Sequence, residues 1–255
     1  MGNPVRNKGI TPFMTNEIPL VSVVVPMYNE EDNIGVLLEK IEAVFATLPG
    51  YGYECLFVND CSTDRTRTQL GRLAETHSHL KPVHLMTNSG QSAALMAGLH
   101  HAEGEYILTL DGDLQNDPAD FPEFLHQLQE YDCVFGYRAN RKDTLLKRIS
   151  SRVANYVRNL ILHDGVRDSG CGSKGFRRHC IEHLVLFNGM HRFLAVFMRM
   201  AGCSIIEIPV KHHPRIHGTS KYGLNNRLWR GLYDLIGVGW LRRRMIKLQV
   251  ESGKH

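Results

Sequence analysis

The stretch VSVVVPMYNEEDNIGVLLEKIEAVFATL, residues 21–48, contains a strand pattern, a polar loop and a helix pattern in that order. Residues 21–25 are mostly β-branched and stop at Pro26, which is typical of a buried strand. The apolar residues that then recur at helical spacing are Ile34, Leu37, Leu38, Ile41, Phe45 and Leu48. The stretch therefore predicts a strand, a loop at residues 28–31 and an amphipathic helix.

The same alternation continues along the chain. The spacing predicts further strands at residues 53–58, 82–86, 106–110 and 133–135, and helices at residues 63–75, 90–101 and 120–130. Later residues predict a helix at 145–162, a glycine-rich segment at 170–175, more helix up to Gly202, a strand at 205–210 and C-terminal amphipathic helices. Alternating strands and helices imply right-handed crossovers, and hence an α/β domain with a mainly parallel, Rossmann-like sheet flanked by helices.

The domain organisation expected from this pattern is simple. With 255 residues, 43% of them hydrophobic, the chain can bury one core of ordinary domain size. Residues 1–17 lack periodicity and are expected to form a disordered leader. One domain is expected at residues 18–222, followed by an amphipathic helical segment at 223–255.

Composition excludes several classes of protein. The net charge is +4 and basic residues crowd after about Arg138, which favours an anionic partner. No nucleic-acid motif accompanies them and aromatics make up 8%, so phosphates of a small ligand or lipid are expected rather than nucleic acid. The expected location is cytoplasmic, since we find neither a signal peptide nor an apolar stretch long enough to span a bilayer. The six cysteines are expected to be reduced, and no Cys/His spacing typical of a zinc site occurs.

Polar clusters follow three of the predicted strands. They are the segments 28–31, 59–60 and 111–113. Ligands of such sheets bind at the carboxyl ends of the strands, so these clusters are expected to lie together. Asp111 and Asp113, with Gln115, offer the oxygen ligands that a hard divalent cation requires, although Asp-x-Asp is also common in a solvated turn.

These clusters resemble family 2 glycosyltransferases of the GT-A fold. The matching segments are VVVPMYNEE (23–31), VNDCSTD (58–64), NSG (88–90) and LDGDLQ (110–115). The resemblance implies that a nucleotide-sugar donor is bound by Pro26, Tyr28, Glu30, Asp60, Asn88, Gly90 and Asp111. It implies that Asp111, Asp113 and Gln115 hold Mg²⁺ or Mn²⁺. Asn59 departs from the family pattern, in which a second Asp is common, and Glu31 and Asp64 are as well explained as charges at helix N-termini.

The second half resembles polyprenyl-phosphate glycosyltransferases of the dolichol-phosphate mannose synthase type. The matching segments are GYR (136–138), KRISSRVAN (147–155), DSGCGSKGFR (168–177) and RIHGTSKYG (215–223). By this resemblance, the residues expected to bind the donor and acceptor phosphates are Arg138, Arg148, Arg152, Arg215, Ser220 and Lys221. Guanidinium groups suit such contacts because they bind phosphate in a bidentate manner.

The resemblance implies an inverting transfer of a sugar from a UDP- or GDP-sugar to a polyprenyl phosphate. Asp111, Asp113, Arg138 and Asp168 are the expected catalytic residues. A phosphate acceptor is already ionised, so Asp168 need only orient the substrates, or it could merely pair with Arg167 or Arg177. Two alternatives stay open: a saccharide acceptor, for which Asp168 or another carboxylate would be the base, and a non-catalytic sugar-nucleotide-binding subunit.

The C-terminal segment predicts a helix that docks on the cytoplasmic face of a membrane. The residues that form its apolar side are Leu224, Leu228, Trp229, Leu232, Leu235, Ile236 and Trp240. Arg242, Arg243 and Arg244 supply positive charge. The alternative is that this side packs against the domain. A membrane-protein partner or a homo-oligomer is a further possible means of reaching lipid.

Overall fold

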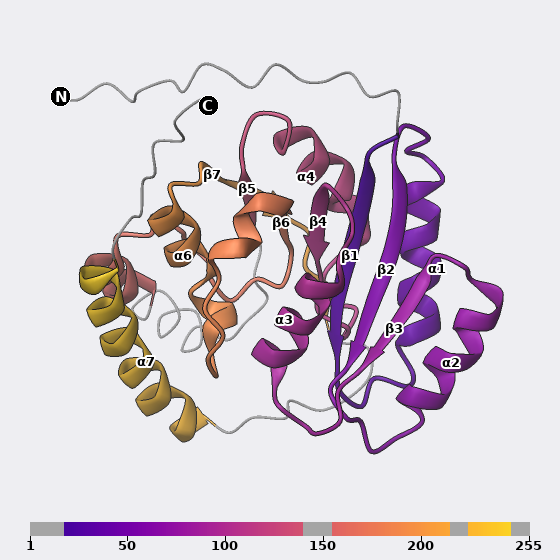
Figure 1. Ribbon diagram of the computed structural model, residues 1–255, viewed down its shortest axis with the longest axis horizontal. Coiled ribbons are helices and arrows are strands. Elements are labelled where there is room, and N and C mark those ends of the chain that lie inside the picture. Colours follow the sequence, from indigo (N-terminus) through magenta and orange to yellow (C-terminus); the bar gives the residue numbers. More distant parts are fainter. Residues whose placement is uncertain (1–17, 140–154, 215–223, 246–255) are drawn as a thin grey trace, which may run out of the picture.

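The computed structural model describes residues 18–139, 155–214 and 224–245, and within them a seven-stranded sheet forms the centre of the molecule (Figure 1). The strand order is β3-β2-β1-β4-β6-β5-β7. The strands are β1 (Leu20–Met27), β2 (Gly52–Asn59), β3 (Leu80–His84), β4 (Tyr106–Thr109), β5 (Cys133–Arg138), β6 (Lys174–Arg177) and β7 (Ile205–Val210). All neighbours are parallel except β6, which runs antiparallel to both β4 and β5.

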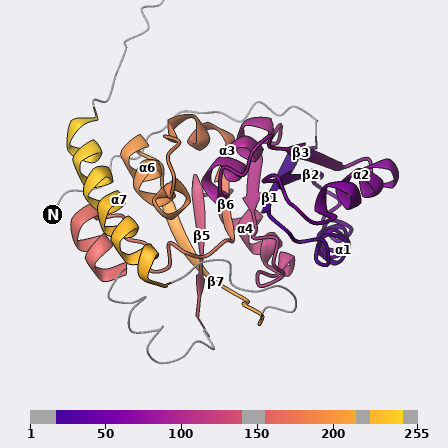
Figure 2. The ribbon, with the colours of Figure 1, turned by 90° about the horizontal axis from the view of Figure 1, so that it is seen from below.

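Helices cover both faces of this sheet. They are α1 (Ile34–Phe45), α2 (Thr66–Thr76), α3 (Gln91–His101), α4 (Phe121–Gln127), α6 (Leu194–Ala201) and α7 (Leu224–Arg244). Residues 155–162 are also helical. Figure 2 shows α3 and α6 on one side of the sheet and α1 and α4 on the other, with α7 beside α6 at the margin. The expected α/β class, with a mainly parallel sheet flanked by helices, is confirmed.

Two apolar clusters fill the two layers. Successive side chains of a strand point to opposite faces, so Val23 of β1 packs with α1 and α4 whereas Val24 packs with α3 and α6. Leu37 of α1 belongs to the first cluster and Phe197 of α6 to the second, and both side chains are almost inaccessible to solvent. Burial of each such side chain contributes about 1.5–3 kcal/mol, which fixes the strand ends that carry the polar loops.

Most predicted elements are confirmed, and the strand at 205–210 has the predicted bounds. Strand β6 was missed, because four residues with one buried glycine give no alternating pattern. Gly175 packs closely there, since a Cβ would lie 3.1 Å from side-chain atoms of Leu128 and Phe124 and would press on them. The expectation of continuous helix up to Gly202 is wrong: two 3₁₀ helices, η2 (Arg178–His183) and η3 (Met190–Arg192), precede α6.

The remaining expectations concern the ends and one internal segment. The leader 1–17 and residues 145–154 of the predicted helix lie outside the described residues, while 155–162 are helical as predicted. The domain boundaries at 18–222 and 223–255 stay a prediction. Helix α7 confirms the C-terminal helix. In the part of the chain that the structure describes, no helix combines the length and apolar character needed to cross a bilayer.

Candidate active site

The polar loops predicted to meet do follow the carboxyl ends of adjacent parallel strands. Met27, the last residue of β1, is in register with Asn59 of β2, and Val24 is in register with Thr109 of β4. The loops that begin at residues 28, 60 and 110 therefore leave the same edge of the sheet. This edge is the expected ligand site of a doubly wound α/β sheet.

The loop after β1 is tied to the loop after β2. Asn29 adopts a left-handed conformation with φ 51°, which Asn tolerates better than most residues. Its main-chain N–H donates to Ser62 Oγ at 2.9 Å, and its Oδ1 accepts from Thr63 N at 2.8 Å. Glu30 Oε2 accepts from Asn33 Nδ2 at 2.6 Å, so its carboxylate also fixes the start of α1.

The structure gives Asn59 a clear local role. Its side chain is buried, with Oδ1 accepting from Ser62 N at 2.9 Å and Nδ2 lying 3.3 Å from Nδ1 of His84. An amide can donate and accept in this position, whereas an ionised carboxylate could only accept. The departure from the family pattern is therefore accommodated by a partner on β3.

Asp60 holds a third loop in place, a contact that the sequence did not reveal. Its two carboxylate oxygens accept from Ser89 N at 2.7 Å and from Gly90 N at 2.8 Å, and Asn88 Nδ2 donates to its main-chain oxygen. Gly90 has φ +87°, a conformation that favours glycine, and a Cβ there would meet no atom within 4 Å. The backbone conformation of Gly90 thus explains the glycine, because no other protein atom lies close enough to exclude a side chain.

Glu31 and Asp64 serve the N-terminus of α2, as the helix-charge interpretation predicted. Asp64 Oδ1 accepts from Thr66 N at 2.9 Å, and Glu31 Oε2 accepts from Arg65 N at 2.8 Å. Burial alone would raise the pKa of Asp64, but hydrogen bonds from Thr66 and Glu31 lower it below the usual Asp range. Both carboxylates are therefore structural acceptors.

The Asp111–Gln115 loop is held from several sides. Asp111 Oδ1 accepts from Gln91 Nε2 at 3.0 Å, and Asp113 Oδ1 accepts from Gln115 N at 3.2 Å. Leu114 has φ 60° and is buried, so its side chain anchors the sharp turn between Asp113 and Gln115. His213, just after β7, donates its main-chain N–H to Gln115 O at 2.9 Å.

The glycine-rich segment packs directly on this loop. A Cβ on Gly172 would lie 2.3 Å from Asp111 Oδ2 and 2.8 Å from Asn116 Oδ1, so a larger residue would force these side chains to move. Thr109 Oγ1 donates to Gly172 O at 2.8 Å and fixes the contact. The segments 110–116 and 168–174 are therefore in direct contact.

Arg138 and Asp168 form a bidentate ion pair within this site. Arg138 Nε lies 2.7 Å from Asp168 Oδ2, and Nη2 lies 2.8 Å from Oδ1, with side-chain exposures of 17% and 9%. Burial alone would lower the pKa of Arg138, but the hydrogen bonds and charge of Asp168 raise it. The half-buried guanidinium therefore stays charged.

The alternative partners considered for Asp168 are wrong. Arg167 instead lies 3.6 Å from Glu207, and its main-chain N–H donates to the same carboxylate. Arg177 donates to main-chain oxygens at the end of α4. Asp168 therefore pairs with Arg138 and with neither of these two arginines.

Lys174 is a site residue that the sequence prediction omitted, although it falls inside the segment 168–177. Its side chain is buried and its ammonium donates to the main-chain oxygen of Cys171. Burial lowers the pKa of Lys174, while the charges of Asp111 and Asp168 act in the opposite direction. Its position two residues after Gly172 was the available signal.

Of the other predicted site residues, some lie at the expected edge of the sheet and the rest lie outside the described residues. Pro26 is in register with Val58 near the end of β1, and Tyr28 follows that strand, so both lie at the expected edge. Arg148, Arg152, Arg215, Ser220 and Lys221 lie outside the described residues. No observation here tests their assignment to the phosphates.

Comparison of the sequence with known protein families identifies the family of this chain. Residues 22–185 match the family described as glycosyl transferase family 2, and the chain belongs to that family. The expected resemblance and the glycosyltransferase class are confirmed.

Two curated relatives are close in sequence. Dodecaprenyl-phosphate galacturonate synthase of Rhizobium johnstonii is 40% identical over 232 residues, covering 88% of this chain and 67% of the relative. Undecaprenyl-phosphate 4-deoxy-4-formamido-L-arabinose transferase of Klebsiella pneumoniae is 37% identical over 218 residues, covering 85% and 66%. The chain therefore spans about two thirds of the length of these relatives.

Solved structures share the fold at lower identity. Glucosyl-3-phosphoglycerate synthase of Mycobacterium tuberculosis, in complex with Mn²⁺, UDP and glucosyl-3-phosphoglycerate, has a TM-score of 0.64 and 18% identity over 88% of this chain and 80% of that one. A mannosyltransferase of Pyrobaculum calidifontis in complex with GDP-mannose and Mn²⁺ has a TM-score of 0.60 and 22% identity, covering 91% and 66%. The predicted GT-A type of fold is confirmed by these neighbours.

Proposed function

We propose that the chain transfers one sugar from a nucleotide-sugar to a polyprenyl phosphate. The observation that carries the proposal is the packing of Gly172 on Asp111, which joins the acidic loop to the segment bearing Asp168 and Lys174. The names of the two curated relatives point to polyprenyl phosphates as the acceptor class. The donor nucleotide, UDP or GDP, is left open by the described residues.

Asp111, Asp113 and Gln115 are proposed to hold Mg²⁺ or Mn²⁺. The donor set fits a hard cation, because two carboxylates and an amide oxygen come from one tight loop with an anchored turn at Leu114. When bound, the cation neutralises the charge that develops on the departing diphosphate. The presence of Mn²⁺ with a nucleotide in two structural neighbours supports this assignment.

In the proposed reaction, a phosphate oxygen of the acceptor forms a bond to the anomeric carbon. The bond between that carbon and the donor diphosphate breaks, and nucleoside diphosphate leaves. A phosphate monoester is already ionised near neutral pH and needs no base. Since both oxygens of Asp168 accept from Arg138, this carboxylate is suited to positioning. Arg138 adds positive charge beside the acidic loop.

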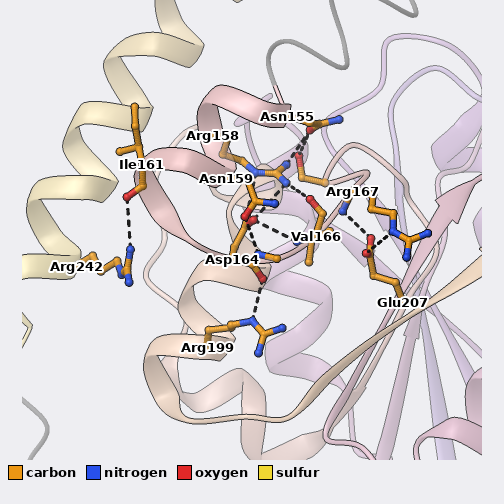
Figure 3. Close-up of polar contacts among 12 residues, drawn as sticks. Asn155, Arg158, Asn159, Ile161, Asp164, Val166, Arg167, Arg199, Glu207 and Arg242 are labelled. Atoms are coloured by element: carbon orange, nitrogen blue, oxygen red, sulfur yellow. Dashed lines mark hydrogen bonds and ion pairs between the residues drawn. The ribbon is translucent and has the colours of Figure 1, made fainter. Parts of the chain in front are cut away.

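Polyprenyl phosphates are carried in membranes, and we propose that α7 and residues 155–162 dock the protein on the cytoplasmic face. Leu235 and Val238 of α7 are buried against the domain, whereas Ile236 and Trp240 are 63% and 62% exposed. Leu160, on the neighbouring helix, is 62% exposed. Figure 3 shows Arg242 of α7 beside Ile161, whose main-chain oxygen it contacts at 3.4 Å.

Incubation of the protein with labelled UDP- and GDP-sugars and short polyprenyl phosphates tests the proposal. The expected result is a lipid-phosphate-linked sugar, formed only when Mg²⁺ or Mn²⁺ is present and lost in Asp113→Ala. Transfer to free saccharides without any activity on lipid phosphate would establish the saccharide alternative. Donor binding without transfer or hydrolysis would establish a binding subunit.

A further inference from the structure

Three cysteine thiols meet in the second half of the domain, away from the active site. They belong to Cys133, the first residue of β5, Cys180 in η2 and Cys203 between α6 and β7. Their Sγ atoms all lie within 4.8 Å of one another, and the three residues are 0%, 0% and 8% exposed. We call this set the thiol cluster.

The fold itself brings these thiols together. Strand β5 lies between β6 and β7, with Cys133 in register with Phe176 on one side and Ile205 on the other. Helix η2 directly follows β6, so it places Cys180 beside the start of β5. The main-chain N–H of Cys133 also donates to Ser204 O at 3.0 Å. Because β5 pairs with both β6 and β7, the start of β5, helix η2 and the turn before β7 lie next to one another.

The thiol cluster is separate from the catalytic edge. Cys133 begins β5, whereas Arg138 ends it, and five residues of strand span about 16 Å. The catalytic edge offers oxygen ligands from Asp111 and Asp113, whereas the cluster offers sulfur. The oxygen ligands of the acidic loop therefore suit a hard cation such as Mg²⁺ or Mn²⁺, whereas the sulfur ligands of the thiol cluster suit a softer cation such as Zn²⁺.

A fourth donor lies at the surface side of the cluster. His179 Nε2 is 3.5 Å from Cys180 Sγ and 3.4 Å from Asp132 Oδ1, and the histidine side chain is 58% exposed. Tetrahedral zinc with Zn–S bonds of about 2.3 Å and Zn–N bonds of about 2.0 Å would set its sulfur ligands about 3.8 Å apart and a sulfur and nitrogen about 3.5 Å apart. The three sulfur atoms need only small movements to reach this geometry. His179 lies outside the group of atoms within 4.8 Å of one another, so its ring would have to turn toward Cys133 and Cys203.

We propose that Cys133, Cys180 and Cys203 bind one Zn²⁺ as thiolates, with His179 Nε2 as the fourth ligand. Binding releases the three thiol protons, and no oxidant or reductant is needed. A closed set of four protein ligands is the form of a structural site. The metal would hold β5, β7 and η2 together, and His179 Nε2 would exchange its contact with Asp132 Oδ1 for the bond to zinc.

The sequence did not predict this site because its ligands follow no compact spacing. Cys/His zinc motifs usually supply two ligands within a few residues, and here the nearest pair is His179 and Cys180. The other two thiols come from the start of β5 and from the turn before β7. Tertiary packing alone makes the set recognisable.

The test uses the full chain, purified without a polyhistidine tag or chelator and supplied with zinc during expression. Elemental analysis should find about one zinc per chain, and Co²⁺ exchanged for it should show the charge-transfer absorption of cobalt thiolates. Cys180→Ser and Cys203→Ser should lose the metal. Cys55→Ser, which removes an isolated buried thiol of β2, should keep it, and so should Asp113→Ala.

The possible outcomes are decisive. Wild-type protein that takes up neither zinc nor Co²⁺ with a thiolate spectrum overturns the proposal, as does full zinc retention in folded Cys180→Ser. If the serine variants misfold, the milder His179→Ala decides instead: it keeps all three thiolates, and we expect at least tenfold weaker zinc affinity in a competition titration. Unchanged affinity in His179→Ala removes the histidine from the ligand set and contradicts the proposed four-ligand site.

Discussion

Arg138, at the end of β5, and Asp168, in the loop before β6, are joined by two parallel hydrogen bonds of 2.7 and 2.8 Å. A third contact, from Arg138 N to Asp168 Oδ2, measures 3.3 Å. A carboxylate held in this way cannot turn toward a substrate hydroxyl without breaking a buried ion pair. The geometry therefore favours a positioning role for Asp168 over that of a general base.

The positioning role predicts the behaviour of Asp168→Asn. We expect kcat to fall about 100-fold, since a misplaced substrate-orienting group has an effect of this size. The acidic limb of the pH–rate profile should persist, because no titrating base has been removed. The matched control Glu103→Gln weakens the exposed Lys81–Glu103 pair, shortly before β4, and should retain activity. Loss of an acidic limb in Asp168→Asn alone would show that Asp168 is a base.

The contact between Gly172 and Asp111 predicts a strong effect of one methyl group. Gly172→Ala places a Cβ 2.3 Å from Asp111 Oδ2, so the acidic loop must move. We expect Mn²⁺ and donor affinity to fall more than tenfold while far-ultraviolet circular dichroism stays unchanged. Gly71→Ala, on α2 where a Cβ meets nothing within 4 Å, should stabilise the fold by about 0.5–1 kcal/mol and leave binding intact. Equal Mn²⁺ affinity in Gly172→Ala and wild type would contradict a metal site at Asp111.

The sequence predicted what depends on local pattern and on motif. Short apolar runs located β1, β2 and β7, and the polar loops after β1 and β4 were expected at one edge. What it missed depends on contacts between distant residues. Strand β6 is defined by its two neighbours, and the acceptance by Asp60 of two main-chain N–H groups from residues 89 and 90 leaves no trace in spacing. Lys174 lay within a recognised motif, but its burial became visible only in three dimensions.

Asp60 offers a test of the loop that precedes α3. In Asp60→Asn, one amide group would face a main-chain N–H donor, and an unsatisfied buried group costs about 1–3 kcal/mol. We expect nucleoside diphosphate affinity, measured by calorimetry, to fall between fivefold and 150-fold as the loop at 88–90 loosens. Asp132→Asn disturbs a similar carboxylate, which accepts from Ser204 N at the opposite end of the sheet. Asp132→Asn should lower Tm without changing nucleotide affinity. The role of Asp60 would be disproved if Asp132→Asn lowered nucleotide affinity and Asp60→Asn did not.

Glu54 predicts the pH dependence of stability. It is 3% exposed, with Ser22 Oγ, Lys81 Nζ and Glu103 N within 2.7 Å. Burial would raise the pKa of Glu54, but the hydrogen bonds from Lys81 and Ser22 lower it below the usual Glu range.

Because the folded pKa of Glu54 lies below the unfolded value of about 4.3, its stabilisation is present above that pH and is lost as pH falls through the folded pKa. Urea unfolding of Glu54→Gln should therefore show a loss of about 1.5–3 kcal/mol near pH 7 that narrows below about pH 4. Glu39→Gln, an exposed change on α1, should follow the wild type at every pH. A difference for Glu54→Gln that does not vary with pH would contradict the ionised form.

The exposed apolar side of α7 predicts binding to anionic vesicles. Ile236 and Trp240 are more than half exposed, while Leu235 and Val238 are buried, so the two sides of the helix can be tested separately. Arg243 and Arg244 are exposed, and each basic residue near an anionic surface adds about 1 kcal/mol of attraction, which salt screens. Flotation with phosphatidylglycerol vesicles should show binding at low salt that weakens at high salt. The double variant Ile236→Ser, Trp240→Ser should bind at least tenfold more weakly with an unchanged Tm, because neither side chain packs in the core.

Leu235→Ala should instead lower Tm and leave vesicle affinity intact. If the double variant floats as well as the wild type, or if neutral vesicles bind equally, α7 does not dock on lipid, and a membrane-protein partner becomes the explanation for access to the acceptor.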